Sequence, residues 1–506
     1  MAIGIAEQNE QITYLRSVLA ILTTSTNDLI AELSSSSAGK AAVSNGAKTN
    51  PDVRIPKTPK AEEARKRAIA ATTSLEAAIL TPQWRHGHLA HSYYISRALH
   101  MVVEWEIPQL LAANGPMTLD ALASKTGIAD PSKLGFVMRT LCAHHICWYP
   151  YHRDIGRLVR TVVLTKCKKE VPTLAAAVEL DFQSDNIFSE TSHDVFANEE
   201  ASTALATDER LATSVRFASF LFPTADVLAG LLKDPVLCAS YEPRDSAFAK
   251  SIGKGMGQFE YLNAHPEWRD CFDFWLASLG EYLHGLTDVR GYPWETTLRN
   301  GAVIVDVGGG LGSSIQSLRT NLPHHKNDFV GIVQDQPGMI AHATAHCNKT
   351  DPQALTSGVV KLTPHDFFNE NPVKGADVYW FRSVIVDWQD KDLTTMFTHI
   401  RNAMAPGKSR LLIGEYIPHP TCGDALLPDA PAPLLKNYGA FQSMGLIGGF
   451  VLTASPNGRQ RTFQDLDRVV KAAGLKIVKV WICRGLGNVI ECRLKEDRAT
   501  GTNGSH

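Results

Sequence analysis

The apolar positions near the start of the chain recur with the spacing of an α-helix. Over residues 8–33, leucine and isoleucine return at intervals of three, four or seven, which places them on one stripe of a helix. The stripe consists of Ile12, Leu15, Leu19, Leu22, Leu29 and Leu33. It is buried either on the chain's own body or on a partner subunit, and the pattern leaves both open. We assign residues 1–34 to this helix and the small, polar residues 35–60 to a flexible linker.

Residues 61–292 are expected to be largely helical. Within them, residues 88–148 hold two short helices joined by a tight turn and followed by an apolar strand, ICWY. Thr118 can cap the first helix, and Asp130-Pro131 starts the second with proline at its favoured position. This order of elements is typical of a winged helix.

A winged helix can bind DNA, but its second helix here carries only Lys133 and Arg139 as basic residues. We therefore expect it to serve packing or dimerisation. Residues 150–190 show no clear pattern and are treated as an atypical insertion. From His193 to about Tyr292 the pattern is helical again, and its aromatic residues could form core or a pocket for an apolar substrate.

The period changes in residues 293–495. Four short runs that are apolar on both faces alternate with helical stretches: AVIVDVGGG, FVGIVQD, ADVYWFRSVIV and SRLLIGEYI. This alternation predicts an α/β domain with a doubly wound, Rossmann-like parallel sheet. Two further strands around Gly485–Gly487 predict an antiparallel hairpin at the sheet edge, and residues 496–506 are expected to be a disordered tail.

Composition narrows the functional classes. With 50 basic and 52 acidic residues among 506, the net charge of −2 provides no field for nucleic acid or an anionic membrane. No apolar stretch approaches the roughly 20 residues of a membrane span, and the N-terminal segment lacks the pattern of a secretory signal. Nine cysteines without a CxxC pair favour reduced thiols in the cytoplasm over disulfides or a metal site.

The strongest motif is the strand, glycine turn and helix start in VIVDVGGGLGSS. Gly308 and Gly310 let a ligand approach the backbone, and the helix that follows offers unpaired N–H groups. Because position 313 is serine, the turn is not the dinucleotide motif GxGxxG. Asp306 inside the turn suits a cationic amine and is a poor neighbour for a pyrophosphate.

Two later carboxylates complete this signal. Asp335 ends the second strand, where it can accept both hydroxyls of a ribose. Asp366 lies beside Phe367, which suits an exocyclic amine and a stacked base. Together with Asp306 these features fit S-adenosylmethionine, whereas the alternative is that they are strand-end caps and core aromatics.

Residues 88–494 resemble the plant- and fungal-type small-molecule O-methyltransferases. The resemblance rests on VDVGGGLG, QDQP, HDFF, ADVYWFRSVIVDWQD, GEYI and GRQRT, which fall in the family's order and spacing. It implies a winged-helix dimerisation region, a class I methyltransferase domain and a homodimer. It also adds Trp388 and Arg382 to the cofactor-binding set, and it leaves residues 150–190 as a loop, an insertion or retained intron sequence.

The resemblance also implies that some catalytic residues of the family are absent from this sequence. The family's histidine base falls at Val386, and of its two orienting glutamates Glu415 is present while the other is Gln460. A family aspartate that contacts substrate aligns with Gly449. Valine cannot accept a proton, so the cofactor motifs are intact while the base is missing.

This combination resembles the methyltransferase-like pericyclases of fungal polyketide–peptide pathways that lead to 2-pyridone alkaloids. Such a reaction needs a shaped apolar pocket and fixed charge near a carbonyl, and no base. Arg382 is a candidate donor, and the candidate pocket residues are Asn437, Tyr438, Phe441, Gln442 and Met444. A cofactor or structural contact is the alternative for Arg382, and core packing is the alternative for Tyr438 and Phe441.

Three hypotheses follow, and the first is favoured. The chain is a pericyclase that binds S-adenosylmethionine without consuming it and acts on a small polyketide–peptide substrate. The second hypothesis is that the chain is a genuine O-methyltransferase for an acidic hydroxyl or carboxylate, which ionises without a base. The third is a catalytically inactive partner of another methyltransferase, which the intact cofactor motifs disfavour.

Overall fold

A computed structural model describes most of the chain and divides it into two compact units. The described residues are 5–35, 58–143, 187–272, 275, 291–299, 301–322, 327–424, 426–483 and 487–495. The first unit consists of Met1–Phe222 and Pro266–Ser278, and the second of Pro223–His265 and Leu279–His506. The predicted tail, the ICWY strand, nearly all of the 150–190 stretch and most of the 35–60 linker lie outside the described residues.

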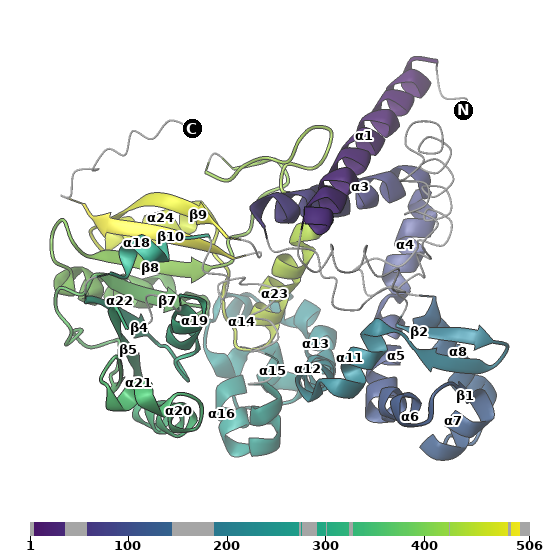
Figure 1. The fold of residues 1–506 in the computed structure, drawn as a ribbon, viewed down its shortest axis with the longest axis horizontal. Coiled ribbons are helices and arrows are strands. Elements are labelled where there is room, and N and C mark those ends of the chain that lie inside the picture. Colours follow the sequence, from purple (N-terminus) through teal and green to yellow (C-terminus); the bar gives the residue numbers. More distant parts are fainter. Residues whose placement is uncertain are drawn as a thin grey trace. The chain divides into compact units, whose positions relative to one another are not determined.

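The first unit is mostly helical, as predicted. Its helices are α1 (Ile5–Ser35), α3 (Pro59–Ile79), α4 (Pro82–His91), α5 (Tyr93–Glu104), α6 (Ile107–Asn114), α7 (Leu119–Thr126), α8 (Pro131–Cys142), α11 (Glu200–Thr207) and α12 (Glu209–Phe220). Thr118 caps α7 and Pro131 starts α8, as the sequence predicts. Residues of α5, α6, α7 and α8 form a core that includes Leu122 and Met138, and Figure 1 shows these helices near one another.

A small sheet corrects one prediction. Residues 193–198 were expected to be helical, but β2 (Phe188–Ser192) and β3 (Val195–Asn198) form an antiparallel hairpin, and β3 also pairs with β1 (Met117–Thr118). The hairpin turns at Asp194, whose φ of 59° is left-handed. Phe188 and Phe196 are buried in the helical core, so packing of these aromatic side chains overrides the local pattern.

The N-terminal stripe packs partly within its own chain. α1 lies along α3 (Figure 1), with an ion pair between Lys60 and Asp28. The most buried positions of α1 are Val18 and Ser25, whereas Ile12 is exposed. Of the predicted stripe, Ile12 is exposed and the five leucines are partly buried.

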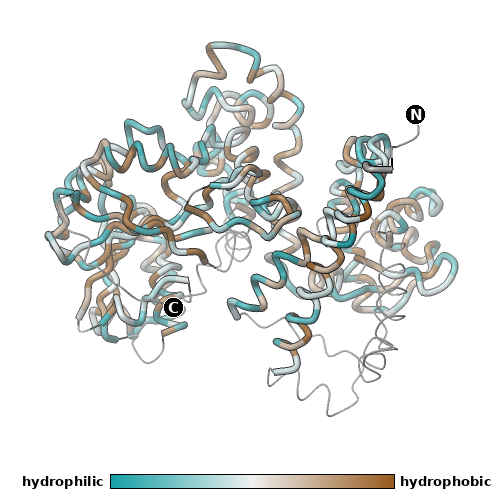
Figure 2. Tube along the Cα trace, turned by 90° about the horizontal axis from the view of Figure 1, so that it is seen from above, coloured by the Kyte–Doolittle hydropathy of each residue, from teal (hydrophilic) through white to brown (hydrophobic). Residues whose placement is uncertain are grey.

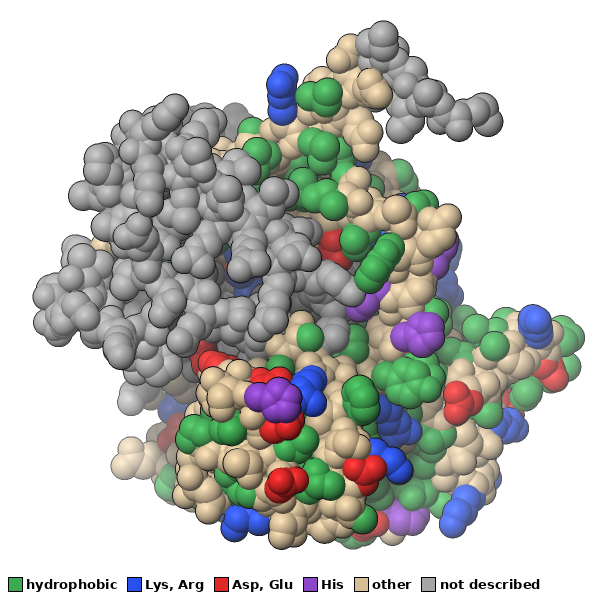
Figure 3. Space-filling view, turned by 90° about the vertical axis from the view of Figure 1, so that its right-hand side faces the viewer, with side chains coloured by type: hydrophobic (Ala, Val, Ile, Leu, Met, Phe, Trp, Pro, Cys, Tyr) green, Lys and Arg blue, Asp and Glu red, His purple; other side chains and the backbone are tan. Residues whose placement is uncertain are grey.

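One of the two basic residues of α8 is engaged within the first unit. Arg139 makes ion pairs with Glu190 and Asp194 of the neighbouring hairpin. Figure 3 looks onto the side of the molecule that carries α7, α8 and β2, where acidic and basic side chains are interspersed with apolar ones. This agrees with the expectation that the winged helix serves packing.

Length and composition alone would allow residues 211–233 to cross a membrane, a property shared by core helices of soluble proteins. The segment is divided between α12 and α13 (Phe222–Lys233), and Arg216 lies within it. The sequence-based statement that no stretch approaches this length is therefore too strict.

The second unit contains a seven-stranded sheet in the order β6-β5-β4-β7-β8-β10-β9. The parallel strands are β4 (Ala302–Val307), β5 (Phe329–Asp335), β6 (Val360–Pro364), β7 (Val378–Arg382) and β8 (Arg410–Glu415). The predicted edge hairpin is confirmed as the antiparallel strands β9 (Leu475–Ile482) and β10 (Asn488–Leu494). Gly485 itself lies outside the described residues.

Both faces of the sheet are covered, which explains why its strands are apolar throughout. Tyr379 and Phe381 pack against α22 (Asp390–Ala403) and α24 (Phe463–Ala472). Trp380 and Val378 face the opposite core, which contains α18 (Trp294–Thr297), α19 (Ser313–Asn321), α20 (Pro337–Thr350) and α21 (Pro352–Thr356). Figure 2 shows hydrophobic residues concentrated along these strands. The doubly wound α/β class is thereby confirmed.

Residues 223–265 cluster with the sheet rather than with the first unit. They form α13, α14 (Pro235–Ala239), η1 (Pro243–Asp245), α15 (Ala247–Ser251) and α16 (Gln258–Ala264). The Ser455 hydroxyl donates to Gln258 Oε1 at 2.8 Å, and Asn457 Nδ2 donates to Ser240 O at 3.1 Å. These bonds tie the segment to the end of α23 (Ser443–Ala454).

Candidate active site

The glycine turn follows β4 directly and presents open backbone. Gly308, Gly310 and Gly312 have φ of 70°, 54° and 80°, a region that L side chains rarely adopt. A Cβ at Gly308 would lie 3.0 Å from Val384, whereas one at Gly310 would meet nothing within 4 Å. The turn thus leaves space for a ligand beside the start of α19.

Asp306 lies under this turn as a buried carboxyl group. It is 1% exposed, and its Oδ2 has no hydrogen-bond partner among the described residues. Burial raises its pKa to about 7; Arg382 opposes the shift and Asp335 adds to it. A cationic group placed here would satisfy both the unpaired oxygen and the negative charge.

Asp335 lies against the same turn, as predicted. Its Oδ2 accepts a hydrogen bond from Gly310 N at 2.8 Å, and its Oδ1 accepts one from Gln336 N at 2.7 Å. Each oxygen retains acceptor capacity, since an ionised carboxylate has about four lone-pair sites. The side chain can therefore hold the turn and still accept hydroxyl groups.

Asp366 and three aromatic rings form the next wall. Asp366 Oδ1 accepts from Phe368 N at 3.0 Å. Phe367 and Phe368 lie edge-on to Trp388, with ring centroids 5.5 and 4.9 Å away. A Cβ at Gly308 would be 3.7 Å from Phe367, so this cluster borders the glycine turn. The predicted cofactor residues Asp306, Gly308, Gly310, Asp335, Asp366, Phe367 and Trp388 thus come from one edge of the sheet.

The ends of β7 and β8 carry the other candidate residues. Val386 is buried in η2 (Ile385–Asp387). Glu415 is 5% exposed, its Oε1 accepts from Tyr416 N at 3.1 Å, and its Oε2 has no partner among the described residues. Burial raises the pKa of Glu415 to about 8, so the group is mostly protonated at neutral pH.

Arg382 lies between the two buried acids. Burial lowers its pKa, and the charges of Asp306 and Glu415 oppose that shift. No residue of the described parts of the chain makes a hydrogen bond or ion pair with its guanidinium. Arg382 therefore offers a positive charge that a bound molecule can use.

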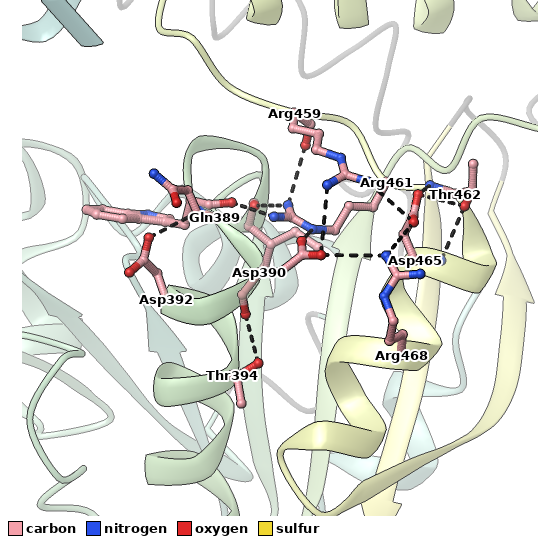
Figure 4. A network of polar contacts seen from close by, with 11 residues as sticks. Gln389, Asp390, Asp392, Thr394, Arg459, Arg461, Thr462, Asp465 and Arg468 are labelled. Carbon is pink, nitrogen blue, oxygen red and sulfur yellow. Dashed lines mark hydrogen bonds and ion pairs between the residues drawn. The ribbon is translucent and has the colours of Figure 1, made fainter. Parts of the chain in front are cut away.

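A buried arginine holds η2 in place (Figure 4). Arg461 is 3% exposed and donates to Ile385 O at 2.8 Å, to Trp388 O at 2.5 Å and to Asp390 Oδ1 at 2.8 Å. Arg459 N donates to Val386 O at 2.7 Å. Sequence reasoning used this GRQRT segment only for Gln460 and missed Arg461, although the motif contained it.

Asp387 was also missed. Its side chain is exposed, and no hydrogen bond or ion pair reaches its carboxylate from any residue that the structure describes. Desolvation by the surrounding protein raises its pKa to about 7, although part of the residue is exposed. No signal in the sequence separates this aspartate from a capping one such as Asp392.

Two of the lost family residues are coupled. Gln460 Nε2 donates to Gly445 O of α23 at 2.9 Å. A Cβ at Gly449 would lie 2.5 Å from Gln460 Oε1, so the glutamine side chain fills the space of a side chain at 449. The position of the Gln460 side chain therefore explains why residue 449 is a glycine.

The predicted pocket residues differ in their burial and in their hydrogen-bond partners. Asn437 Nδ2 donates to His419 O at 3.0 Å and its Oδ1 accepts from Gly439 N at 2.9 Å, so the turn of its own loop uses the amide. Tyr438 is buried with a φ of 62° and Phe441 is partly buried in η3 (Gly439–Gln442). Gln442 keeps a buried, unpartnered Oε1, and the side chain of Met444 lies outside the described residues. Among the described residues, no cluster of His, Cys, Asp or Glu could hold a metal ion.

Known families match both units. The O-methyltransferase domain matches residues 232–476, and the O-methyltransferase dimerisation domain matches residues 87–150. A relative from Aspergillus terreus, O-methyltransferase gedA, is 30% identical over 465 residues, which cover 85% of this chain and 86% of the relative.

Two solved structures share the fold. OxaC in complex with sinefungin and meleagrin aligns with a TM-score of 0.59 and 20% identity, over 94% of this chain and 99% of OxaC. LepI in complex with SAM aligns with a TM-score of 0.59 and 17% identity, over 85% of this chain and 93% of LepI.

Proposed function

This chain belongs to the O-methyltransferase family, and from that premise we propose that it transfers a methyl group from S-adenosylmethionine to an acidic hydroxyl of a small natural product. The relative gedA, which matches over most of its length, is named an O-methyltransferase. The order of the two leading hypotheses from the sequence is thus reversed, and the pericyclase stays a prediction.

The cofactor fits the glycine edge of the sheet. The unpaired carboxyl of Asp306 would hold the amine, and the free oxygen lone pairs of Asp335 would accept the ribose hydroxyls. Phe367 and Trp388 would border the adenine. The open space at Gly310 would let the ligand approach the backbone of the glycine turn. When bound, S-adenosylmethionine supplies an electrophilic methyl group on a positively charged sulfur.

The observation that carries the substrate class is the state of Glu415. In the family this glutamate orients the histidine base, and here Val386 leaves its Oε2 without a partner. The site therefore offers no imidazole to a hydroxyl proton. A phenol, enol or carboxylic acid that ionises near neutral pH is the substrate that such a site can use.

A second candidate is the pericyclase, favoured by Arg382. Its guanidinium has no ion pair within the described residues and can donate to a carbonyl oxygen of a reacting polyene, while Val386 adds an apolar surface. A polyketide–peptide 2-pyridone intermediate would be the substrate. Neither acid nor base is consumed in this reaction, and the methyl group stays on the cofactor.

One incubation separates the candidates. The protein is mixed with S-adenosylmethionine labelled in the methyl group and with an extract of fungal polyketides. Label in a new product supports methyl transfer, whereas a new product without label supports the pericyclase. Gly310→Arg, which places a bulky cation in the open face of the turn, is the control that should abolish labelling. Neither product, with cofactor binding intact, would indicate an inactive partner subunit.

The protein is further proposed to be a homodimer. The match to the O-methyltransferase dimerisation domain at residues 87–150 supports this assembly. The stripe of α1, which α3 leaves only partly buried, offers an additional apolar surface to a second copy.

A further inference from the structure

We propose that the carboxylate of Asp387 accepts the proton of the substrate hydroxyl and so takes the role that the family gives to the preceding residue. This inference rests on the proposed methyl transfer and extends it to hydroxyls that do not ionise unaided. It makes Asp387 a catalytic residue on the same turn as the lost histidine.

The position of Asp387 places it at the cofactor edge. Val384, three residues earlier, lies against the glycine turn, since a Cβ at Gly308 would be 3.0 Å from its side chain. Trp388, the next residue, packs against Phe367 and Phe368. Asp387 therefore lies between two residues that border the predicted cofactor site.

The carboxylate is free to act. Ile385 and Val386 of the same turn are buried, whereas the Asp387 side chain is exposed and has no partner within the described ranges. Asp390, three residues later, shows the contrast, because Arg461 donates to it and Arg459 and Arg468 make ion pairs with it. Of these two neighbouring acids, only Asp387 is left for a ligand.

The backbone around Asp387 is held firmly. The Arg461 side chain and the Arg459 N–H bind the carbonyl groups of Ile385, Val386 and Trp388. Gly458 packs so closely on this turn that a Cβ there would lie 2.6 Å from Val386 O. A base must be held within hydrogen-bond reach of its substrate, and this clamp restricts where the carboxylate can move.

The charged groups near Asp387 come from neighbouring elements. Glu415 on β8 is close enough for the Asp387 charge to raise its pKa. Arg461 and Arg459 approach from the loop before α24, and Arg382 lies at the end of β7. Burial raises the pKa of Asp387 to about 7. A carboxylate of that strength is matched to proton transfer near neutral pH.

The step balances without another reactant. The substrate O–H bond breaks, its proton goes to an Asp387 oxygen, and its electron pair remains on the substrate oxygen. That pair forms the new O–CH₃ bond as the C–S bond of the sulfonium breaks, which leaves a neutral thioether. Asp387 then returns the proton to solvent, to which its side chain is open.

The test compares Asp387→Asn with wild type on a series of substituted phenols, from strongly acidic 4-nitrophenol to weakly acidic 4-methoxyphenol. We expect the variant to lose about 10²–10⁴-fold in kcat on the weak acids and little on 4-nitrophenol, which is ionised already. The wild-type rate on weak acids should fall below a pH of about 7, and the variant should lose this dependence. Asp387→Glu should restore part of the rate.

The matched control is Asp226→Asn, an exposed aspartate on α13 that should change nothing. Calorimetry should show the same S-adenosylmethionine affinity in Asp387→Asn as in wild type, and the infrared carboxyl band that titrates near neutral pH should disappear. Equal losses on all phenols, or no loss on any, would overturn the role of Asp387 while leaving methyl transfer standing. If wild type transfers no methyl group to any phenol, the proposed function itself fails and this inference fails with it.

Discussion

At the scale of single residues, the environment of each acid decides its chemistry. Asp335 and Asp390 are occupied by donors, whereas Asp306 and Glu415 are buried with an unpartnered oxygen and Asp387 is free. The sequence could predict that Asp306 and Asp335 border a glycine turn, because strand ends converge at one sheet edge. It could not predict which acids lack partners, since that depends on Arg461 and Arg459, some 70 residues away.

Glu415→Gln should stabilise the protein increasingly as the pH rises. The folded pKa of about 8 lies above the 4.5 of an ordinary glutamate in the unfolded chain, so the wild type loses stability as the pH rises from the unfolded to the folded pKa. Glutamine has no charge to lose, and the gain should be on the order of 4 kcal/mol at pH 8 and near zero at pH 4. Urea unfolding at several pH values measures it. A gain that does not change with pH would contradict the assignment.

Asp306 should make cofactor binding pH-dependent. A cationic amine binds the ionised carboxyl, and the pKa of about 7 means that Asp306 is protonated below neutral pH in the free protein. We expect the S-adenosylmethionine affinity to fall about tenfold for each pH unit below that value. Calorimetry from pH 5 to 8 tests this, with Asp306→Asn as the control that should bind weakly at every pH. A flat wild-type profile would refute the amine site.

At the scale of elements, the sheet could be predicted because its strands alternate with helices and are apolar on both faces. The hairpin β2–β3 could not, because FSETSHDVFAN is short and of mixed polarity and pairs only once Phe188 and Phe196 are buried. The contact between Gln460 and α23 could not be predicted either. The Gln460 side chain occupies the space that a side chain at Gly449 would need. These are tertiary effects that a local pattern does not contain.

The contact between Gln460 and α23 predicts that the effect of Gly449→Ala on stability changes sign when Gln460 is removed. Gly449→Ala should destabilise the protein by about 1–2 kcal/mol, because its Cβ would overlap Gln460 Oε1. In a Gln460→Ala background the same change should stabilise it by about 0.5–1 kcal/mol, as expected for alanine in a helix. Gly448→Ala is the matched control, since its Cβ would meet Gln460 at an ordinary 3.7 Å. Denaturant midpoints of the four variants measure the coupling, and additive effects would contradict it.

At the scale of the whole molecule, the family's two domains match residues 87–150 and 232–476, and the N-terminal helices α1 and α3 precede both matches. The dimerisation domain matches residues 87–150, and the α1–α3 pair leaves the apolar stripe of α1 only partly buried. Because the mass of one chain is 55.3 kDa, light scattering should give about twice that value at micromolar concentration. A mass of one chain at that concentration would refute the dimer.

The central claim is that the methyl group leaves the cofactor, and its stoichiometry tests this most directly. S-adenosylhomocysteine and product are counted by mass spectrometry during turnover of an acidic phenol or enol substrate. The account predicts one S-adenosylhomocysteine for each molecule of methylated product, and none in the Gly310→Arg variant. Product that accumulates while S-adenosylmethionine remains intact would contradict methyl transfer and favour the pericyclase.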